Sequence, residues 1–318
     1  MGKYLLKRVL LLIPTLLLVC FIIFSLMRMV PGSAVDVIIE KLKAGSGAAP
    51  DRAAIEAMLG LDKPFFTQFF IWIGNVLRGD LGTPIFQTDP VSTIIAHKLP
   101  ITLELVFLIL VISVVVSIPL GLLAAACQDT WVDNVIRVVS VIIMSLPIFW
   151  VATLVLVYPA AWWEYVPPAK YVPFFTNPGQ NLRMFLPPAI IGGLANAGGN
   201  LRTVRTLTLE VLRQDYIRTA WSKGLKERAI LFTHAFRNTL IPTITMIGGS
   251  VTGLMGGSVI LENLFNIPGI GTQLTSSLSV YDYPVVQGCV LIMAIIGMVI
   301  TLIVDISYST ADPRVKLD

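Results

Sequence analysis

The densest group of charged side chains in this sequence lies in residues 202–242, where Lys and Arg recur among acidic and aromatic residues. Lys223, Lys226, Glu227 and Arg228 fall within one short stretch of it. Such side chains are suited to ionic and hydrogen-bonded contact with another protein rather than to bond-making chemistry. A connection of this length without a role of its own is uncommon in a compact protein. We therefore expect residues 202–242, called here the docking segment, to bind a partner.

Side chains that would support catalysis or cofactor binding form no recognisable pattern. The sequence holds no Gly-x-x-x-x-Gly-Lys-Ser/Thr phosphate loop, so any ATP chemistry belongs to a partner. The apolar runs hold no Ser–His pair, paired Asp or metal cluster of the kind a membrane enzyme needs. His97 and His234 are far apart, and Cys20, Cys127 and Cys289 lie within or at the end of apolar runs, as buried hydrophobic residues do. We predict a non-catalytic chain with no cofactor or metal of its own.

The composition indicates a chain whose solvent is mostly lipid. Mean hydropathy is +0.81 and only 13% of the residues are charged. Uncharged apolar runs predict spanning helices at 9–27, 105–127, 138–163, 239–261 and 284–304. A sixth run, 184–201, is interrupted by glycine and asparagine, and we expect a helix that faces protein rather than lipid. The predicted fold class is all-α, a polytopic membrane protein with six transmembrane helices.

The distribution of Lys and Arg predicts the orientation. Six spans place both termini on one side, and the segments on that side, the docking segment included, hold most of the basic residues. Both termini are therefore expected in the cytosol, and the first run is expected to be an anchor rather than a cleaved signal peptide. The predicted parts are 1–30, an extracytoplasmic segment 31–98 with an aromatic helix at 65–77, and a five-helix core at 99–318. The net charge of +4 is not read as a nucleic-acid signal.

Within the docking segment, hydrophobic spacing predicts two short helices. The first continues the fourth span through 208–220 and ends before Gly224, which marks a break or a C-terminal cap. The second begins at Leu225, where Leu225, Ala229, Phe232 and Phe236 form one apolar stripe. Pro242 is expected at the start of the fifth span. The alternative interpretation is an amphipathic helix lying on anionic lipid.

The spacing of the Ala, Gly, His, Asn and Pro residues in this segment resembles that in the cytoplasmic loop of bacterial ABC-importer permeases. In importers generally that loop reads Glu-Ala-Ala, three residues, Gly, nine residues, Ile-x-Leu-Pro. This chain departs from it, with Arg218-Thr219-Ala220 first and His234-Ala235-Phe236-Arg237 last. The departures are those of the dipeptide/oligopeptide/nickel permease family, in which Arg-Thr-Ala, Lys-Gly and His-x-x-Arg-Asn-x-x-x-Pro are usual. The residues that carry the match are Arg218, Ala220, Lys223, Gly224, Lys226, Glu227, Arg228, His234, Arg237, Asn238 and Pro242.

Further strings extend the resemblance along the chain, including Val-Pro-Gly at 30–32, Arg-Gly-Asp-Leu-Gly at 78–82 and Asn-Ile-Pro-Gly-Ile-Gly at 266–271. Their order is similar to the first of two permease subunits. The resemblance implies a type I importer fold in a bacterial or archaeal inner membrane. It implies as partners a second homologous permease, two ATPase subunits that hold ATP and Mg, and an extracytoplasmic solute-binding protein. The docking segment would then hold the coupling helix, seated in a groove of one ATPase.

The pathway and the cargo are less clearly marked. Gly249, Gly253 and Gly257 form a small-residue face that suits either a pathway wall or close helix packing. Glu104, near the outer end of the second span, suits either contact with a peptide amine or extension to the membrane interface. The family implies a peptide-class solute, with nickel chelates, glutathione, opines or oligosaccharides as alternatives. A secondary transporter or a membrane enzyme is a more remote alternative.

Overall fold

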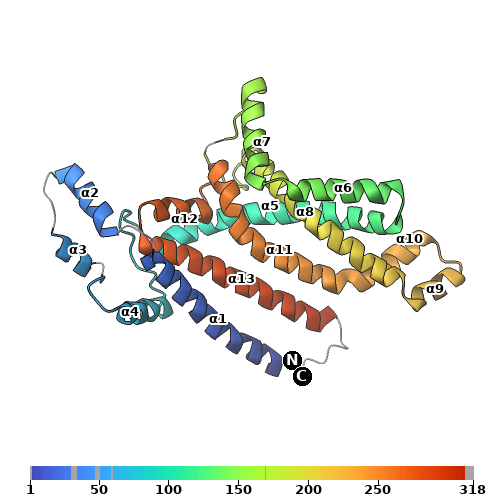
Figure 1. Cartoon of the computed structure of the whole chain (residues 1–318), viewed down its shortest axis with the longest axis horizontal. Helices are drawn as coiled ribbons and strands as arrows, with labels where there is room; N and C mark the ends of the chain where they lie inside the picture. The colour runs from blue at the N-terminus through green and yellow to red at the C-terminus, as the bar shows by residue number, and fades with distance from the viewer. Residues whose placement is uncertain (1, 30–33, 47–50, 59, 169, 312–318) are drawn as a thin grey trace. The chain divides into compact units, whose positions relative to one another are not determined.

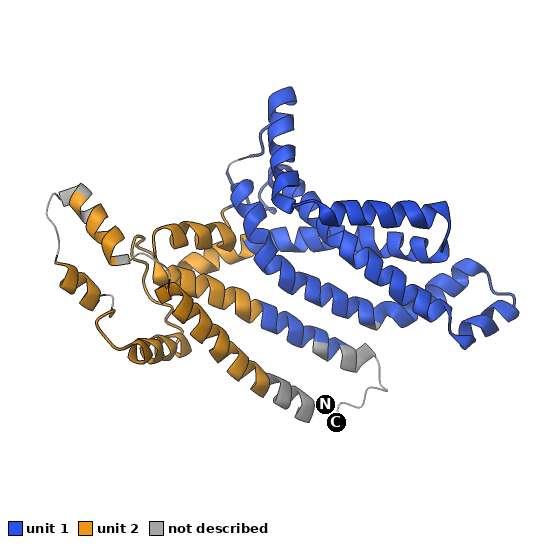
Figure 2. Cartoon of the chain, in the orientation of Figure 1, with its two compact units in different colours: residues 1–5, 102–267, 297–318 blue, residues 6–101, 268–296 orange. Residues whose placement is uncertain are grey.

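The computed structural model describes residues 2–29, 34–46, 51–58, 60–168 and 170–311, and these residues form helices and connections without a strand (Figure 1). This confirms the predicted all-α class. The chain folds into two compact units (Figure 2). Unit 1 comprises residues 1–5, 102–267 and 297–318, and unit 2 comprises residues 6–101 and 268–296.

Among the described residues, four helices are long and apolar enough to cross a membrane. They are α1 (Gly2–Met29), α5 (Val91–Ala126), α11 (Arg237–Leu264) and α13 (Tyr283–Ala311). Three of them contain a predicted apolar run whole, and α5 contains all but the last residue of the run 105–127, so those four predictions are confirmed as long apolar helices. The apolar runs within them are uncharged because no water is present in a bilayer core to solvate an ionised side chain.

The predicted third span, 138–163, is wrong as a single helix. The chain forms α6 (Trp131–Ser145) and α7 (Ile148–Trp163), which are bent by 88° at a short break. Pro147 lies at the break and has no amide hydrogen to continue the helical ladder. Leu146, directly before it, takes an extended conformation with ψ 126°, as residues before proline do. The pair is apolar enough to count together as one broken span.

The predicted protein-facing run 184–201 lies within α8 (Pro178–Leu212), the central helix of unit 1. Helices α6, α7 and α11 all pack against α8. A Cβ atom at Gly193 would lie 2.6 Å from Ile112 Cγ2, so glycine is required for this close approach. Asn200 donates to Ser113 Oγ at 3.2 Å, and Ser250 donates to Asn200 Oδ1 at 3.2 Å. The small and polar residues of this run thus serve packing inside unit 1, whereas the total of six spans stays a prediction.

Unit 2 confirms the aromatic helix predicted at 65–77. Helix α4 (Phe65–Leu77) has these bounds, and its Phe69 ring lies 5.3 Å from the Phe24 ring of α1, centroid to centroid. Cys20 and Leu291 complete this buried cluster. Phe69, with Phe65 and Trp72 beside it, therefore serves packing inside unit 2, whereas Phe66 and Phe70 are exposed. Unit 2 also contains α2 (Ala34–Ser46), α3 (Arg52–Met58) and α12 (Ile270–Ser279).

Candidate partner-docking site

The docking segment is largely helical and belongs to unit 1. After α8 come α9 (Asp215–Ser222), α10 (Glu227–Ala229) and η1 (Ile230–Phe236), a π-helix that continues into α11. Figure 1 shows α9 and α10 at the end of the packed pair α8 and α11. The site is therefore a folded projection at one end of a helical hairpin.

The prediction of one continuous helix over 208–220 is wrong, because the helix is interrupted between Leu212 and Asp215. Helix α8 ends at Leu212, and Gln214 is extended, with φ −74° and ψ 149°, before α9 begins. Asp215 in the first turn of α9 favours this new start, because a carboxylate is stabilised near the positive end of the helix dipole. Helix α9 is thus a separate element rather than an extension of the fourth span.

The predicted break at Gly224 is confirmed. Gly224 has φ +76°, a left-handed conformation that glycine adopts without steric cost. Its N–H donates to the carbonyl oxygen of Trp221 at 2.9 Å, and the N–H of Leu225 donates to that of Ala220 at 3.4 Å. This pair of bonds is the Schellman arrangement that ends a helix and satisfies its last carbonyl groups. Gly224 therefore fixes where α9 ends and in which direction the chain leaves it.

A small core holds the docking segment together. Ile217, Ala220 and Ile230 are buried against one another, with Val211 and Leu212 packed on them. Ala220 is therefore buried inside this core rather than presented to a partner. Helix α9 is attached through its apolar face and leaves its opposite face to solvent.

The predicted apolar stripe of the second helix, expected to rest against the membrane domain or a partner, is not the face that packs inside unit 1. Phe232 is 58% exposed and Leu225 is 41% exposed, whereas Ile230 and Ala235 are buried. The cause is the π-helical winding of η1, in which backbone bonds join residues five apart instead of four. Ile230 and Ala235, five residues apart, consequently lie on the inner face. A stripe counted with α-helical spacing does not apply in this stretch.

Asn238 connects the two halves of the docking segment. Its Nδ2 donates to the carbonyl oxygen of His234 at 2.6 Å and to the Tyr216 hydroxyl at 3.2 Å. The first bond lies at the junction of η1 and α11, and the second reaches across to α9. Asn238 is thus placed to hold α9 at a fixed distance from the returning chain.

The outward face of the docking segment combines charged and apolar side chains. Trp221 is 48% exposed, and Leu225 and Phe232 of the same segment are exposed as well. The exposed charged residues of the segment include Arg218, Lys223, Lys226, Glu227 and Arg228. Aromatic and arginine side chains supply much of the binding energy at protein interfaces. The exposure of these predicted docking residues fits a surface that meets a partner.

The remaining predicted residues are placed differently from one another. His234 is half-buried and Arg237 is exposed. Pro242 begins the stretch of α11 that is long and apolar enough to cross a membrane, Pro242–Leu264, so its predicted place at the start of the fifth span is confirmed, although the helix itself begins earlier, at Arg237. The reason is that η1 runs without interruption into α11, which moves the helical start ahead of the proline.

A cleft of about 430 Å³ adjoins the docking segment. Arg218 and Trp221 of α9 and Glu227 of α10 contribute to its lining. Ala125, Ala126 and Gln128 at the end of α5, together with α8 residues, line it as well. The sequence offers little to predict Trp221 as part of this cleft beyond the presence of an aromatic residue in a polar stretch.

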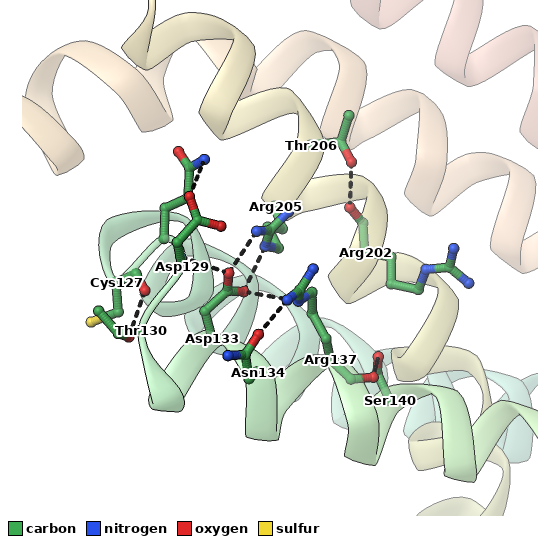
Figure 3. Close-up of polar contacts among 11 residues, drawn as sticks. Cys127, Asp129, Thr130, Asp133, Asn134, Arg137, Ser140, Arg202, Arg205 and Thr206 are labelled. Carbon is green, nitrogen blue, oxygen red and sulfur yellow. Dashed lines mark hydrogen bonds and ion pairs between the residues drawn. The ribbon is translucent and has the colours of Figure 1, made fainter.

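A buried ion pair, which the sequence does not reveal, holds α6 against α8 (Figure 3). Arg205 Nε and Nη2 donate to the two carboxylate oxygens of Asp133, each at 2.7 Å. Asp133 has 0% side-chain exposure and Arg205 15%, and Arg137 Nε lies 3.6 Å from Asp133 Oδ1. The hydrogen bonds with Asp133 raise the pKa of Arg205, so the pair stays charged at physiological pH. Arg205 belongs to the docking segment but serves its attachment rather than its outer surface.

The predicted pathway residues are also in unit 1. Glu104 is half-buried in α5 and accepts a hydrogen bond from the Tyr171 hydroxyl at 3.3 Å. Apart from the chain neighbours and the helix's own backbone, no atom of the described residues lies within 4 Å of a Cβ built at Gly249, Gly253 or Gly257. Neighbouring Gly248 differs, since its Cβ would lie 2.1 Å from Val304 Cγ2. The three-glycine face is therefore open within this chain.

Two family models together match nearly the whole chain. The model described as binding-protein-dependent transport system inner membrane component matches residues 117–317, and its N-terminal companion matches residues 1–106. The chain belongs to this family of inner-membrane transport components. The first match contains the docking segment, the Asp133–Arg205 pair and the open glycine face.

Curated relatives of this inner-membrane component match it over its full length. A Brucella abortus protein provisionally named a peptide transport system permease protein is 40% identical over 319 residues, covering 100% of both chains. The dipeptide transport system permease protein DppB of Lactococcus lactis is 34% identical, with 100% of both chains covered. The oligopeptide transport system permease protein AppB of Bacillus subtilis is 33% identical, with 99% of this chain and 100% of the relative covered.

Membership of the family establishes a multi-pass inner-membrane protein that works in binding-protein-dependent transport. It also confirms the resemblance to peptide permeases on which the sequence-based prediction depends. Among the described residues, no group of three or more His, Cys, Asp or Glu side chains is arranged to hold a metal ion.

Proposed function

We propose that this chain is one of two permease subunits of an ATP-driven importer and that its cargo is a peptide-class solute. The observation that carries the proposal is the folded docking segment, with exposed Trp221 and Phe232 among charged side chains. The full-length similarity to proteins named dipeptide and oligopeptide transport permeases supports the peptide cargo. A second, homologous permease would complete the pathway.

The docking segment would bind one of two ATPase subunits. Helix α9 and the Gly224 turn would enter a groove of the ATPase, with Lys223, Lys226 and Arg228 as its charged contacts. ATP and Mg would be held by the ATPases, because this sequence has no phosphate loop. Closure of the ATPases on ATP would then move the docking segment and shift the permease pair between two states. A solute-binding protein outside the membrane would deliver the cargo.

Co-purification and reconstituted transport test this proposal. The full chain is expressed together with the genes that neighbour its own. It is expected to purify in detergent with a second permease and two ATPase subunits. In proteoliposomes that also contain the binding protein, peptide uptake is expected to require ATP. A chain that purifies alone and moves its solute with an ion gradient would contradict the proposal and favour a secondary transporter.

The alternatives within the family differ only in cargo. Nickel chelates, glutathione, opines and oligosaccharides are the alternatives, and the separate binding protein is expected to select among them. Competition for binding to that protein, with a dipeptide as the reference ligand, distinguishes these cargoes. A binding protein that retains a nickel chelate and ignores dipeptides would replace the peptide assignment without affecting the importer role.

The open glycine face yields a prediction with a matched control. Gly253→Leu is expected to leave the chain folded, because nothing lies within 4 Å of the new Cβ atom and leucine favours helix by about 0.8–1 kcal/mol over glycine. Uptake by the assembled importer is nevertheless expected to fall about tenfold or more, because the new side chain occupies the pathway or the contact with the second permease. Uptake in proteoliposomes and thermal unfolding of the purified chain measure the two effects.

Gly248→Leu is the control on the same helix. Its Cβ atom would meet Val304 Cγ2 at 2.1 Å, so this change is expected to lower the unfolding temperature of the chain. Normal uptake by the Gly253→Leu importer would show that the open face has no part in transport.

A further inference from the structure

A second cavity lies in unit 2, far from the docking segment in sequence. It is a cavity of about 200 Å³ beside the last turn of α1. Arg28 of α1, Gln68 and Trp72 of α4, and Gln287 of α13 contribute to its wall, with Lys63 from the turn before α4. The family assignment and the proposed docking role do not use this cavity.

The charged side chains among the residues that line the cavity are all positive. Arg28 Nε donates to Gln68 Oε1 at 2.8 Å, and the guanidinium carbon of Arg28 lies 3.4 Å from the centroid of the Phe24 ring. Lys63 is a second cation, and no Asp or Glu of the described residues lines the cavity. Within the part of the chain that the structure describes, no carboxylate forms an ion pair with Arg28.

Gln287, one of the residues that line the same cavity, carries an unpaired donor. Gln287 is 4% exposed, and its Nε2 has no hydrogen-bond partner among the described residues. A buried amide group without a partner loses its water and gains nothing in return, so such groups are rare in folded proteins. The cavity residues thus include one amide donor without a hydrogen-bond partner and one guanidinium group without a carboxylate partner. A hydrogen-bond acceptor that carries a negative charge would satisfy both.

We propose that this cavity binds a carboxylate group. A carboxylate is planar, carries one negative charge and accepts hydrogen bonds only, so it matches the N–H groups of Arg28 and Gln287. Ile71 and Trp72 supply apolar wall for a short carbon chain attached to it. The carboxylate comes either from the C-terminus of a short peptide or from an acidic side chain of another protein, since both present the same group.

Thermal unfolding of the purified full chain in detergent, followed by tryptophan fluorescence, tests the proposal. Sodium acetate is titrated against sodium chloride at constant ionic strength, and acetate is expected to raise the unfolding temperature by about 2 °C at saturation. Dialanine and dialanine amide are then compared. A rise with dialanine and none with its amide assigns the site to a peptide C-terminus, and a rise with acetate alone assigns it to a protein side chain.

Two variants make the result specific to the cavity. Gln287→Leu removes the unpaired donor, so the chain without ligand is expected to unfold at an equal or higher temperature while the acetate response disappears. Arg28→Gln is expected to lose the response as well. Arg78→Gln, which changes an exposed arginine outside the cavity, is expected to keep it.

No acetate response in the unchanged chain, or a response that both cavity variants retain, would overturn the proposal. The measurement requires neither ATPase nor uptake. A failure of carboxylate binding is therefore distinguishable from a failure of the proposed importer role.

Discussion

Replacing Gly224 by valine is expected to lower ATP-driven uptake about tenfold while ATP hydrolysis by the importer continues. The left-handed backbone at Gly224, φ +76°, costs about 1–2 kcal/mol for an L-residue, and more for a β-branched one. A penalty of about 1.4 kcal/mol reduces the population of the native turn tenfold relative to alternatives. Because the turn sets the end of α9, the docked geometry is lost before the fold is. Parallel measurements of uptake and ATPase activity in proteoliposomes check this prediction.

Two controls separate the position of Gly224 from the strain itself. Gly224→Asn is expected to retain most uptake, since asparagine tolerates the left-handed conformation. Gly79→Val introduces a similar strain in unit 2, where Gly79 has φ +82° and open space around its Cβ position. This variant is expected to keep ATP hydrolysis coupled to uptake. Unchanged uptake and ATPase activity in Gly224→Val would contradict the proposed role of the turn.

Replacing Asp133 by alanine is expected to destabilise the chain by about 3 kcal/mol. The change leaves Arg205, with 15% side-chain exposure, without the carboxylate that pairs with both of its bonded nitrogen atoms. A charge left unpaired in a buried place costs more than the pair itself contributes. A lower unfolding temperature in detergent and a lower amount of protein in the membrane measure this loss.

Asp215→Ala is the matched control, because it removes the acid of an exposed pair. Asp215 has 96% side-chain exposure and lies 3.4 Å from Arg218, so only a small change in unfolding is expected, from its place in the first turn of α9 and well below that of Asp133→Ala. In addition, the double change Asp133→Leu and Arg205→Met is expected to recover part of the lost stability, since neither charge then remains buried. If Asp133→Ala unfolds like the unchanged chain, the pair does not hold α6 against α8.

Local signals in the sequence account for the predictions that the structure confirms. Helix α4 has the predicted bounds because Pro64 and the residues after Leu77 interrupt helix on both sides. The break at Gly224 is predictable because a glycine between two apolar patterns commonly ends a helix. The four long apolar helices follow from composition alone, as lipid excludes charged residues from their interiors.

Features that depend on distant residues or on unusual winding are not predictable in this way. Arg205 and Asp133 are 72 positions apart in the sequence, and the residues around each of them do not indicate that the two side chains form an ion pair. The π-helix η1 moves Phe232 outward and Ile230 inward, and α-helical counting gives the opposite result. The exposure of Trp221 likewise depends on which face of α9 the core of Ile217 and Ala220 occupies. Such outcomes are decided by packing rather than by local pattern.

The length of helix α8 has a mechanical consequence. From Ala189, past its two internal prolines, to Leu212 it is an unbroken rod of about 36 Å at 1.5 Å per residue. A tilt of about 5° displaces the far end of such a rod by about 3 Å, nearly the spacing of two atoms in contact. Because Asp133 binds α8 through Arg205 near the docking end, α6 must share that movement. A small rotation at the docking end therefore produces a displacement at the other end whose size depends on the length of α8. The position of the Asp133–Arg205 ion pair determines that α6 moves with it.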